Sequence, residues 1–346
     1  MPGHSIIVIG ASAGGVEALT TLVRDLPLDL PASIFVVLHI PAQSPSLLAA
    51  ILMQAGRLPV VQASDGLVIQ PGYIYVAQPD HHLLIEEGQM RSVRGPKENR
   101  HRPAVDPLFR TAAVVYGPKV IGVILTGALD DGTAGLLAVK KQGGIAIVQD
   151  PAEAFYPGMP SSALESVKVD YKLRLTEIAP MLVRLVNEPV DTSLNYPVPE
   201  EMQKEARIVA MNAKELDANE HVGTPSAYSC PECRGVLWEL HDDELLRFRC
   251  RVGHAFSVES VQAEQNEAVE AALWAALKAL EGKSSLSRRL ARQYRAVGNP
   301  TLAQRFEARA QETEQKAHTL QNVLLTVDHS VLPHIALTVE QDDQAS

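Results

Sequence analysis

The segment SIIVIGASAGG, Ser5–Gly15, has the pattern of a strand, a tight turn and a helix, and it is the strongest indication of the fold. Its first five residues are mostly apolar and β-branched, which predicts a buried strand. The residues that follow are apolar at helical spacing, so the strand runs through a short turn into a helix. A small-x-Ser-x-small turn in that place is typical of a nucleophile elbow, which exposes the serine hydroxyl at the carboxyl end of a sheet. Ser12 is therefore a candidate nucleophile, beside a helix N-terminus that favours negative charge.

A phosphate- or dinucleotide-binding loop is the alternative interpretation of this glycine-rich turn. The turn lacks the G-x-G-x-x-G pattern, because Ser12 stands at the middle glycine position, and it has no Walker lysine. The pattern favours the elbow and leaves the other loop as the competing hypothesis.

The composition limits the class of protein. A chain of 346 residues, 46% of them apolar, can form two domains or one large domain with an appendage. The formal net charge of −10 argues against general nucleic-acid binding. No apolar run approaches the roughly 20 residues of a membrane span, and the first strand starts too early to leave room for a signal peptide. The three cysteines lie in one short segment and form no disulfide framework, so we expect a soluble cytoplasmic protein.

Buried strands alternate with helices along the first half of the chain. This alternation predicts an α/β fold with a doubly wound, mainly parallel sheet in a three-layer α/β/α arrangement. The strands are expected at residues 5–9, 34–38, 59–62, 73–77, 120–125 and 145–148, with a hairpin over 82–93. The helices are expected at residues 46–54, 105–116, 133–142 and 177–186.

The composition changes after the α/β domain, which we expect to span residues 1–187. Residues 188–229 are rich in Pro, Glu and Asn and read as a linker with a helix near 200–216. A cysteine module is expected over 230–256, a helical hairpin over 257–330 and a tail over 331–346.

Three polar residues follow predicted strands of the α/β domain. Ser12 follows the first strand, His39 the second, and Asp131 a later one. Because sites in doubly wound sheets form at the carboxyl ends of strands, these residues predict a nucleophile, a base and an orienting acid. Each has a simpler alternative: His39 as a structural hydrogen-bonding group, Asp131 as a helix cap, and Asp130 as the acid in its place.

The residues that carry these features resemble the catalytic domain of the chemotaxis protein-glutamate methylesterases, the CheB family. The resemblance covers roughly residues 5–187. Its motifs are Gly10–Gly15, Leu38–Pro41, Asn99–Phe109, Val123–Gly132 and Phe155–Pro160.

The resemblance implies a hydrolase of glutamate γ-methyl esters, with a possible glutamine deamidase activity, acting on chemoreceptor-type signalling helices. It implies that Ser12 is the nucleophile, His39 the base and Asp131 the orienting acid, with no cofactor for catalysis. Backbone N–H groups near Ala13 and Ala128 would hold the oxyanion. A methyltransferase or another chemosensory protein is a further expected partner, without nucleic acid.

Two arginines lie in one of the shared motifs, and the sequence differs from the family pattern in three respects. Arg100 and Arg102 are expected to guide an acidic receptor surface or to lie in a solvated loop. Ala13 stands where the family often has a hydroxyl residue, and Ala128 where a methionine is common. Since the catalytic strand starts at Ser5, we also expect no preceding receiver domain and therefore no phosphorylation control within the chain.

The cysteine segment has the spacing of a metal site. Cys230 and Cys233 form C-x2-C, and Cys250 and His254 form C-x3-H, with two predicted strands between them. Two such knuckles joined by a hairpin resemble a zinc ribbon, and the four side chains suit a closed structural zinc site. The alternative is three free thiols and a surface histidine.

The basic residues of the helical region allow an alternative to the esterase hypothesis, in which this region binds a partner. Eight basic residues against three glutamates between Lys283 and Lys316 form either a solvated face or a docking face. A catalytically weak scaffold whose zinc and helical half binds a partner is the alternative to the esterase, and Ala13 and Ala128 keep it open.

Overall fold

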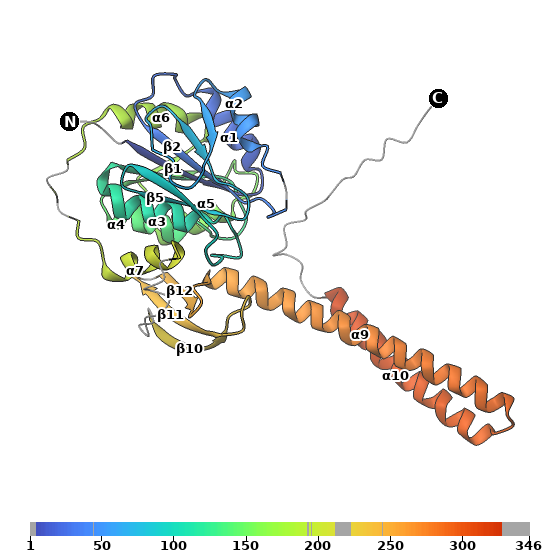
Figure 1. Cartoon of the computed structure of the whole chain (residues 1–346). Coiled ribbons are helices and arrows are strands. Elements are labelled where there is room, and N and C mark those ends of the chain that lie inside the picture. The colour runs from blue at the N-terminus through green and yellow to red at the C-terminus, as the bar shows by residue number, and fades with distance from the viewer. Residues whose placement is uncertain are drawn as a thin grey trace, which may run out of the picture. The chain divides into compact units, whose positions relative to one another are not determined.

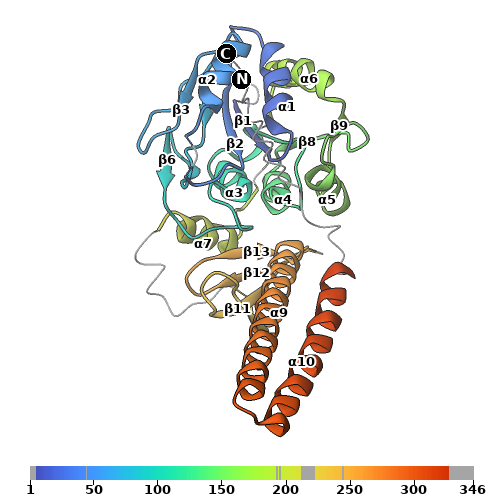
Figure 2. The same cartoon turned by 90° about the vertical axis from the view of Figure 1, so that its right-hand side faces the viewer.

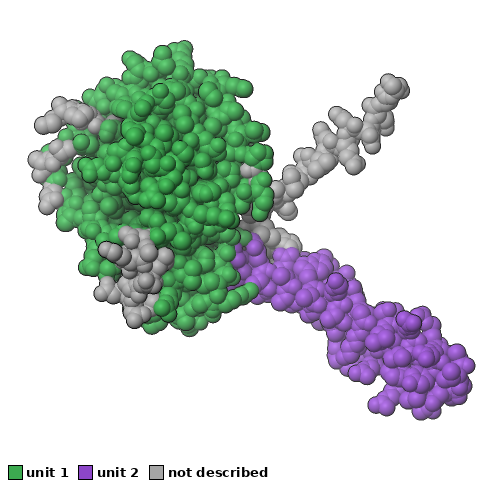
Figure 3. Space-filling model, viewed as in Figure 1, with its two compact units in different colours: residues 1–261 green, residues 262–346 purple. Residues whose placement is uncertain are grey.

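The structure is a computed structural model that describes residues 5–43, 45–191, 194, 196–211, 223–243 and 245–326. Figure 1 shows the whole chain. Residues 212–216 of the expected linker helix and the tail over 331–346 lie outside the described residues. The chain forms two compact units, residues 1–261 and 262–346, which Figure 3 distinguishes by colour.

The first unit is built on a seven-stranded sheet with the strand order β3-β4-β2-β1-β7-β8-β9. Every neighbouring pair of strands in it is parallel. The strands are β1 (Ile6–Ala11), β2 (Ser33–Leu38), β3 (Val60–Gln62), β4 (Ile74–Val76), β7 (Val120–Ile124), β8 (Ile145–Gln149) and β9 (Tyr171–Leu173). All residues of β1, β2 and β7 are buried, because helices cover both faces of a doubly wound sheet.

Helices lie on both faces of this sheet, as Figure 2 shows. One core packs α1 (Gly15–Arg24), α2 (Leu48–Ala55) and α6 (Leu175–Asn187) against the sheet. The other core packs α3 (Val105–Tyr116), α4 (Thr133–Lys141) and α5 (Gly158–Ser166) against the opposite face. The predicted three-layer α/β/α fold with a mainly parallel sheet is confirmed. The short helix η1 (Gly117–Lys119) precedes β7, and β5 (His82–Glu86) pairs with β6 (Gln89–Val93) as the expected hairpin.

Strand β1 lies between β2 and β7, where the order of strands along the sheet reverses. The chain moves from β1 to β2 on one side and returns to β7 on the other. Such a topological switch point opens a crevice at the carboxyl ends of the strands. The turn that contains Ser12 follows β1 at this point.

A second, antiparallel sheet completes the first unit. It has the order β10-β11-β12-β13 and contains β10 (Thr224–Ser229), β11 (Val236–Asp242), β12 (Leu245–Cys250) and β13 (Ala255–Ser257). Helix α7 (Glu200–Val209) precedes it and buries Met202, Glu205 and Val209. The linker expected over 188–229 thus includes a packed helix, and one compact unit extends to Val261.

In the second unit, the described residues form two helices with a core of their own. Helix α9 (Val258–Ala296) begins in the first unit, and α10 (Pro300–Thr326) follows the break at Gly298. Their apolar seam is formed by Leu273, Leu277, Leu280, Ala317, Leu320 and Leu324. Within the described part of the chain, we find no helix with both the length and the apolar character needed to cross a membrane.

Candidate active site

The turn after β1 presents Ser12 at the edge of the sheet. Gly14 has a φ of 73°, a left-handed conformation that glycine adopts without strain, and it is the N-cap of α1. The Ser12 N–H donates to the carbonyl oxygen of Thr126 at 3.0 Å, and the Gly15 N–H donates to the Ser12 carbonyl at 2.8 Å. Because these bonds fix the backbone, the partly exposed Ser12 side chain has a defined position.

His39 lies between Ser12 and Asp131. Its Nδ1 is 3.1 Å from Ser12 Oγ, and its Nε2 is 2.7 Å from Asp131 Oδ2. An ionised carboxylate only accepts, so Nε2 carries the proton that it receives, and Nδ1 is left to accept from the serine hydroxyl. The side chains of His39 and Asp131 are only 5% and 2% exposed. The three side chains are hydrogen-bonded in the order that a nucleophile, a base and an orienting acid would require.

Asp131 accepts hydrogen bonds from several directions. Its Oδ2 accepts from the N–H of Val105 at 2.7 Å, and its Oδ1 accepts from Asn99 Nδ2 at 2.8 Å and from the N–H of Asp106 at 3.3 Å. Val105 and Asp106 are the first residues of α3, where the helix dipole favours a negative charge. Burial raises the pKa of Asp131, but the hydrogen bond and charge of His39 and these donors outweigh burial and lower it to about 2.

A second histidine stacks on the first. The ring of His101 lies 3.7 Å from that of His39, centroid to centroid, at an interplanar angle of 11°. Burial and then the charge of His39 lower the pKa of His101 to about 3, so His101 is neutral at neutral pH. It can fix the plane of the His39 ring without adding a charge beside it.

The loop after β7 lies directly against Ser12. A Cβ on Gly127 would be 2.8 Å from the Cβ of Ser12 and 2.0 Å from Met159 Sδ, so only glycine allows this approach. Among the residues that the structure describes, we find no acceptor for the N–H of Ala13 or of Ala128. The two N–H groups expected to form the oxyanion hole thus have no partner among the described residues, which an oxyanion hole requires.

Arg102 of the 99–103 loop is bonded to residues outside the series Ser12–His39–Asp131. Arg102 donates from Nε to Asp80 Oδ1 at 2.8 Å and from Nη1 to the Gly95 carbonyl at 2.6 Å, which ties its side chain to this protein. Arg100 is next to His101 and contributes to the lowering of its pKa. By contrast, Phe155 is 79% exposed and its Cβ lies near Gly14, so it offers an apolar contact beside the nucleophile turn.

Asp130 does not contact His39. Its Oδ1 accepts from Ser257 Oγ at 2.6 Å, and burial raises its pKa to about 8. Of these two neighbouring aspartates, Asp131 is the one whose carboxylate bonds to His39.

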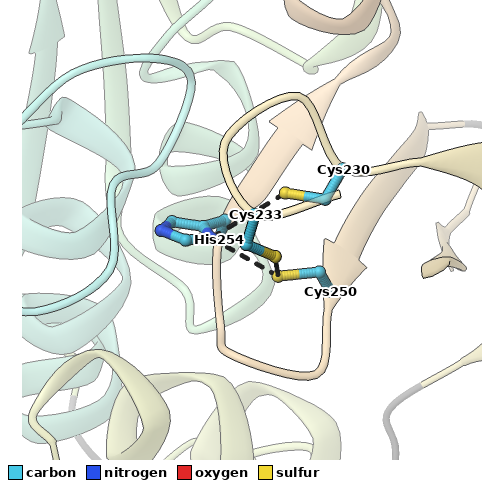
Figure 4. A group of neighbouring side chains, drawn as sticks. All are labelled: Cys230, Cys233, Cys250 and His254. Atoms are coloured by element: carbon cyan, nitrogen blue, oxygen red, sulfur yellow. Dashed lines mark hydrogen bonds between the residues drawn. The ribbon is translucent and has the colours of Figure 1, made fainter. Parts of the chain in front are cut away.

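The four metal-site residues converge, as Figure 4 shows. Their ligand atoms all lie within 4.8 Å of one another. Cys233 Sγ is 3.6 Å from Cys250 Sγ, and His254 Nδ1 is 3.8 Å from Cys230 Sγ and 3.5 Å from Cys250 Sγ. In a tetrahedral site with Zn–S bonds of about 2.3 Å, neighbouring sulfurs are about 3.8 Å apart. The donor set and its spacing therefore fit a tetrahedral metal ion.

Sequence reasoning missed a group of buried charges contributed by α3, α7, β12 and the loop before α3. Glu98 and Glu205 are surrounded by Arg110, Arg247 and Arg249 at distances of 2.7–3.3 Å. We call these five residues the ionic cluster. Reasoning from the sequence also passed over Asn99 and Ser257, since the bond that joins them spans 158 positions and the bond from Asn99 to Asp131 spans 32. Asn99 could have been singled out, because it begins the motif that contains His101.

A family model described as CheB methylesterase matches residues 7–182 of this chain. A crystal structure of the Thermotoga maritima CheB methylesterase catalytic domain is similar, with a TM-score of 0.51 and 38% identity. It covers 52% of this chain and 98% of that one.

Curated relatives match the same part of the chain. A protein of Leptospira interrogans, provisionally named a protein-glutamate methylesterase/protein-glutamine glutaminase, is 44% identical over 53% of this chain and 95% of that protein. The enzyme of that name from Moorella thermoacetica is 40% identical over 54% of this chain, but over only 45% of its own length. For a Xanthomonas campestris enzyme with the same paired name the identity is 40%, over 52% of this chain and 51% of that protein.

Proposed function

The chain belongs to the CheB methylesterase family, and from that membership we propose that it is a protein-glutamate methylesterase. Its substrates are glutamate γ-methyl esters on chemoreceptor-type signalling helices, and it also deamidates glutamines there. The observation that carries the proposal is the series Ser12–His39–Asp131, joined at 3.1 and 2.7 Å.

The reaction proceeds through an acyl-enzyme. Ser12 Oγ attacks the ester carbonyl carbon while His39 Nδ1 accepts the hydroxyl proton and Asp131 stabilises the imidazolium. The N–H groups of Ala13 and Ala128 stabilise the oxyanion; one such donor is typically worth about 3 kcal/mol. The carbon–oxygen bond to methanol then breaks, and the methoxide oxygen takes the proton from Nδ1. A water molecule, deprotonated by Nδ1, attacks the acyl carbon. The bond between the acyl carbon and Ser12 Oγ then breaks, Oγ takes the proton back from Nδ1, and the product carboxylic acid loses its proton to solvent. In deamidation, ammonia leaves in place of methanol.

The test is methanol release from a methylated receptor fragment. Ser12→Ala should lower the rate by at least about a thousandfold, because among the described residues no other hydroxyl is paired with His39. The matched control is Ser64→Ala, which changes an exposed serine outside the site and should leave the rate unchanged. If wild type and Ser12→Ala release methanol equally slowly, the esterase proposal fails and the scaffold alternative replaces it.

We further propose that Cys230, Cys233, Cys250 and His254 hold one structural zinc ion in a zinc-ribbon module. Four protein ligands leave no open position, so the ion supplies folding free energy rather than a reactive water. Elemental analysis of protein purified without chelator should find about one zinc per chain, and Cys230→Ser should lose it together with thermal stability. A metal-free wild type and a normally folded Cys230→Ser variant would both count against the module.

The partners follow from the proposed reaction. The substrate glutamates lie on cytoplasmic signalling helices, so the protein acts in the cytoplasm, with a methyltransferase as the enzyme that would supply its esters. Phe155, exposed beside the nucleophile turn, supports contact with an apolar face of such a helix. Arg102 is paired with Asp80, so its guanidinium group is engaged within this protein.

A further inference from the structure

Asn99 links the orienting acid to another part of the chain. Its Nδ2 donates to Asp131 Oδ1 and to Asp106 Oδ2, both at 2.8 Å, and its Oδ1 accepts from the N–H of Ser257 at 2.9 Å. These partners determine the orientation of the amide, because carboxylates accept and a backbone N–H donates. Asn99 is 5% exposed, so water does not replace these bonds easily.

Ser257 is hydrogen-bonded directly to Asp130 and, through Asn99, to Asp131. Its N–H binds Asn99, which binds Asp131, while its Oγ donates to Asp130 Oδ1 at 2.6 Å. Ser257 Oγ also accepts from the N–H of Ser260 at 3.0 Å, which fixes the hydroxyl at the start of α9. A shift of Ser257 would therefore move Asn99 and the loop that carries Asp131.

The position of Ser257 depends on the metal-site turn. Cys250 ends β12, and its N–H donates to the His254 carbonyl at 2.9 Å. Strand β13 begins at Ala255, directly after His254, and ends at Ser257. The Ala255 carbonyl accepts from the N–H of Asn99 at 2.8 Å. The backbone at Asn99 is therefore bonded to the residue that directly follows the proposed metal ligand His254.

The ionic cluster attaches the antiparallel sheet without help from a metal. Arg249 on β12 contacts Glu98, the residue before Asn99, at 3.0 Å, and Glu205 on α7 at 2.7 Å. Since these side chains are at most 3% exposed, we expect their contacts to remain when the metal is removed. Loss of metal should thus loosen the turn between Cys250 and His254 rather than detach the sheet.

We infer that the Cys230–His254 module controls the hydrolase through Asn99 and Ser257. A metal ion at the four ligands fixes the start of β13, β13 fixes Asn99, and Asn99 holds Asp131 in the rotamer that orients His39. Asn99 and Ser257 are positioning residues, and metal occupancy sets the turnover rate. This inference rests on the proposed function.

The experiment is a thermodynamic cycle on the full chain that combines one substitution, Asn99→Ser, with the removal of zinc. Methanol release is measured for wild type and Asn99→Ser, each with bound zinc and after chelation. Each single change should lower kcat by about tenfold or more with little effect on KM, because no substrate contact is altered. Chelation of Asn99→Ser should add little to the loss already present, since both changes act on the same link.

Two control variants complete the kinetic experiment. Asn266→Ser changes an exposed asparagine of α9 and should respond to chelation like wild type. His254→Cys keeps four ligands, because zinc also binds sites made of four cysteines, and should retain zinc and a near-normal kcat. Losses of kcat that multiply in the cycle, or a chelated enzyme with the kcat of wild type, would overturn the inference.

A spectroscopic readout separates this inference from the proposed function. The proton NMR signal of the His39 Nε2–H reports its bond to Asp131, whether or not the protein hydrolyses any ester. The signal should broaden or shift on chelation and in Asn99→Ser, and Ser257→Ala, which keeps every ligand, should weaken it as well. An unchanged signal in all three refutes the link. A signal that responds in a protein without Ser12-dependent methanol release would retain the link and refute only the esterase.

Discussion

Two adjacent carboxyl groups, Asp130 and Asp131, have opposite environments in this fold. Asp131 accepts from His39, from Asn99 and from the first N–H groups of α3, which lowers its pKa to about 2 in spite of burial. For Asp130, burial dominates, and a single hydroxyl donor, Ser257 Oγ, leaves its pKa at about 8. At neutral pH one acid is thus charged and the other neutral, which suits the charged one to stabilise an imidazolium.

The raised pKa of Asp130 predicts how its replacement changes stability with pH. Between its unfolded pKa of about 3.9 and its folded pKa of about 8, the folded protein binds one more proton than the unfolded chain. Wild type therefore loses stability as the pH rises through this range, and Asp130→Asn does not. Relative to wild type, the variant should gain up to about 1.4 kcal/mol per pH unit. Urea unfolding at pH 5 and pH 8 measures the difference.

The control for this prediction is Asp29→Asn, which changes an exposed aspartate. It should shift the unfolding free energy equally little at both pH values. A difference between Asp130→Asn and wild type that shrinks as the pH rises would show that Asp130 is charged in the folded protein.

At the residue scale, the sequence predicts only part of the candidate site. Ser12, His39 and Asp131 could be proposed because each follows a strand, and the structure brings them together, while their roles remain predictions. Sequence alone could not decide between Asp130 and Asp131, since a shift of one residue changes which carboxyl reaches His39. The bond between Asn99 and Ser257 joins residues 158 positions apart, so no local pattern reveals it.

At the scale of elements, periodicity predicts the parallel sheet but not the burial of β12. The continuous apolar runs of β1, β2 and β7 indicated strands buried on both faces, and these strands are fully buried. In β12, arginines alternate with apolar residues, a pattern typical of a strand with one solvent-exposed face. Arg247 and Arg249 are instead buried, because Glu98 and Glu205 come from distant elements to pair with them.

The ionic cluster makes stability sensitive to one carboxylate of α7. Glu205 contacts Arg110, Arg247 and Arg249. Burial raises the pKa of its carboxyl, but the charges of these arginines outweigh burial and leave the pKa well below the usual range. Glu205→Gln should lower the unfolding free energy by about 3–5 kcal/mol, because it leaves buried positive charge without a partner. Urea unfolding of the zinc-loaded protein measures the loss.

Glu200→Gln is the matched control for the cluster. It makes the same change on the same helix, but Glu200 is 77% exposed and pairs only with Lys204 among the salt bridges of the described chain. We expect no measurable change. Equal effects of the two substitutions would mean that the cluster does not hold α7 and β12 against the α/β core.

At the scale of the whole molecule, the two units have separate apolar cores. The core around the antiparallel sheet ends with Val261, whereas the seam of the second unit begins at Leu273. The Leptospira relative matches this chain over 95% of its own length but only 53% of this chain, so a homologous domain occurs without a comparable C-terminal half. In this chain, however, Glu98 and Arg110 on the α/β side depend on residues from the antiparallel sheet and α7.

Two truncations should therefore differ sharply, although both remove the second unit. A chain that ends at Gln265 keeps Val261, Ser257 and the whole ionic cluster, so its thermal midpoint, zinc content and kcat on a small methyl ester should match those of the full chain. A chain that ends at Met211 loses Arg247 and Arg249, leaves Glu98 and Glu205 with Arg110 alone, and should be unstable and inactive. Calorimetry and methanol release measure both. Full activity in the chain that ends at Met211 would mean that the α/β domain needs neither the antiparallel sheet nor its metal. Loss of activity in the chain that ends at Gln265 would assign the second unit a part in catalysis, which its separate core does not suggest.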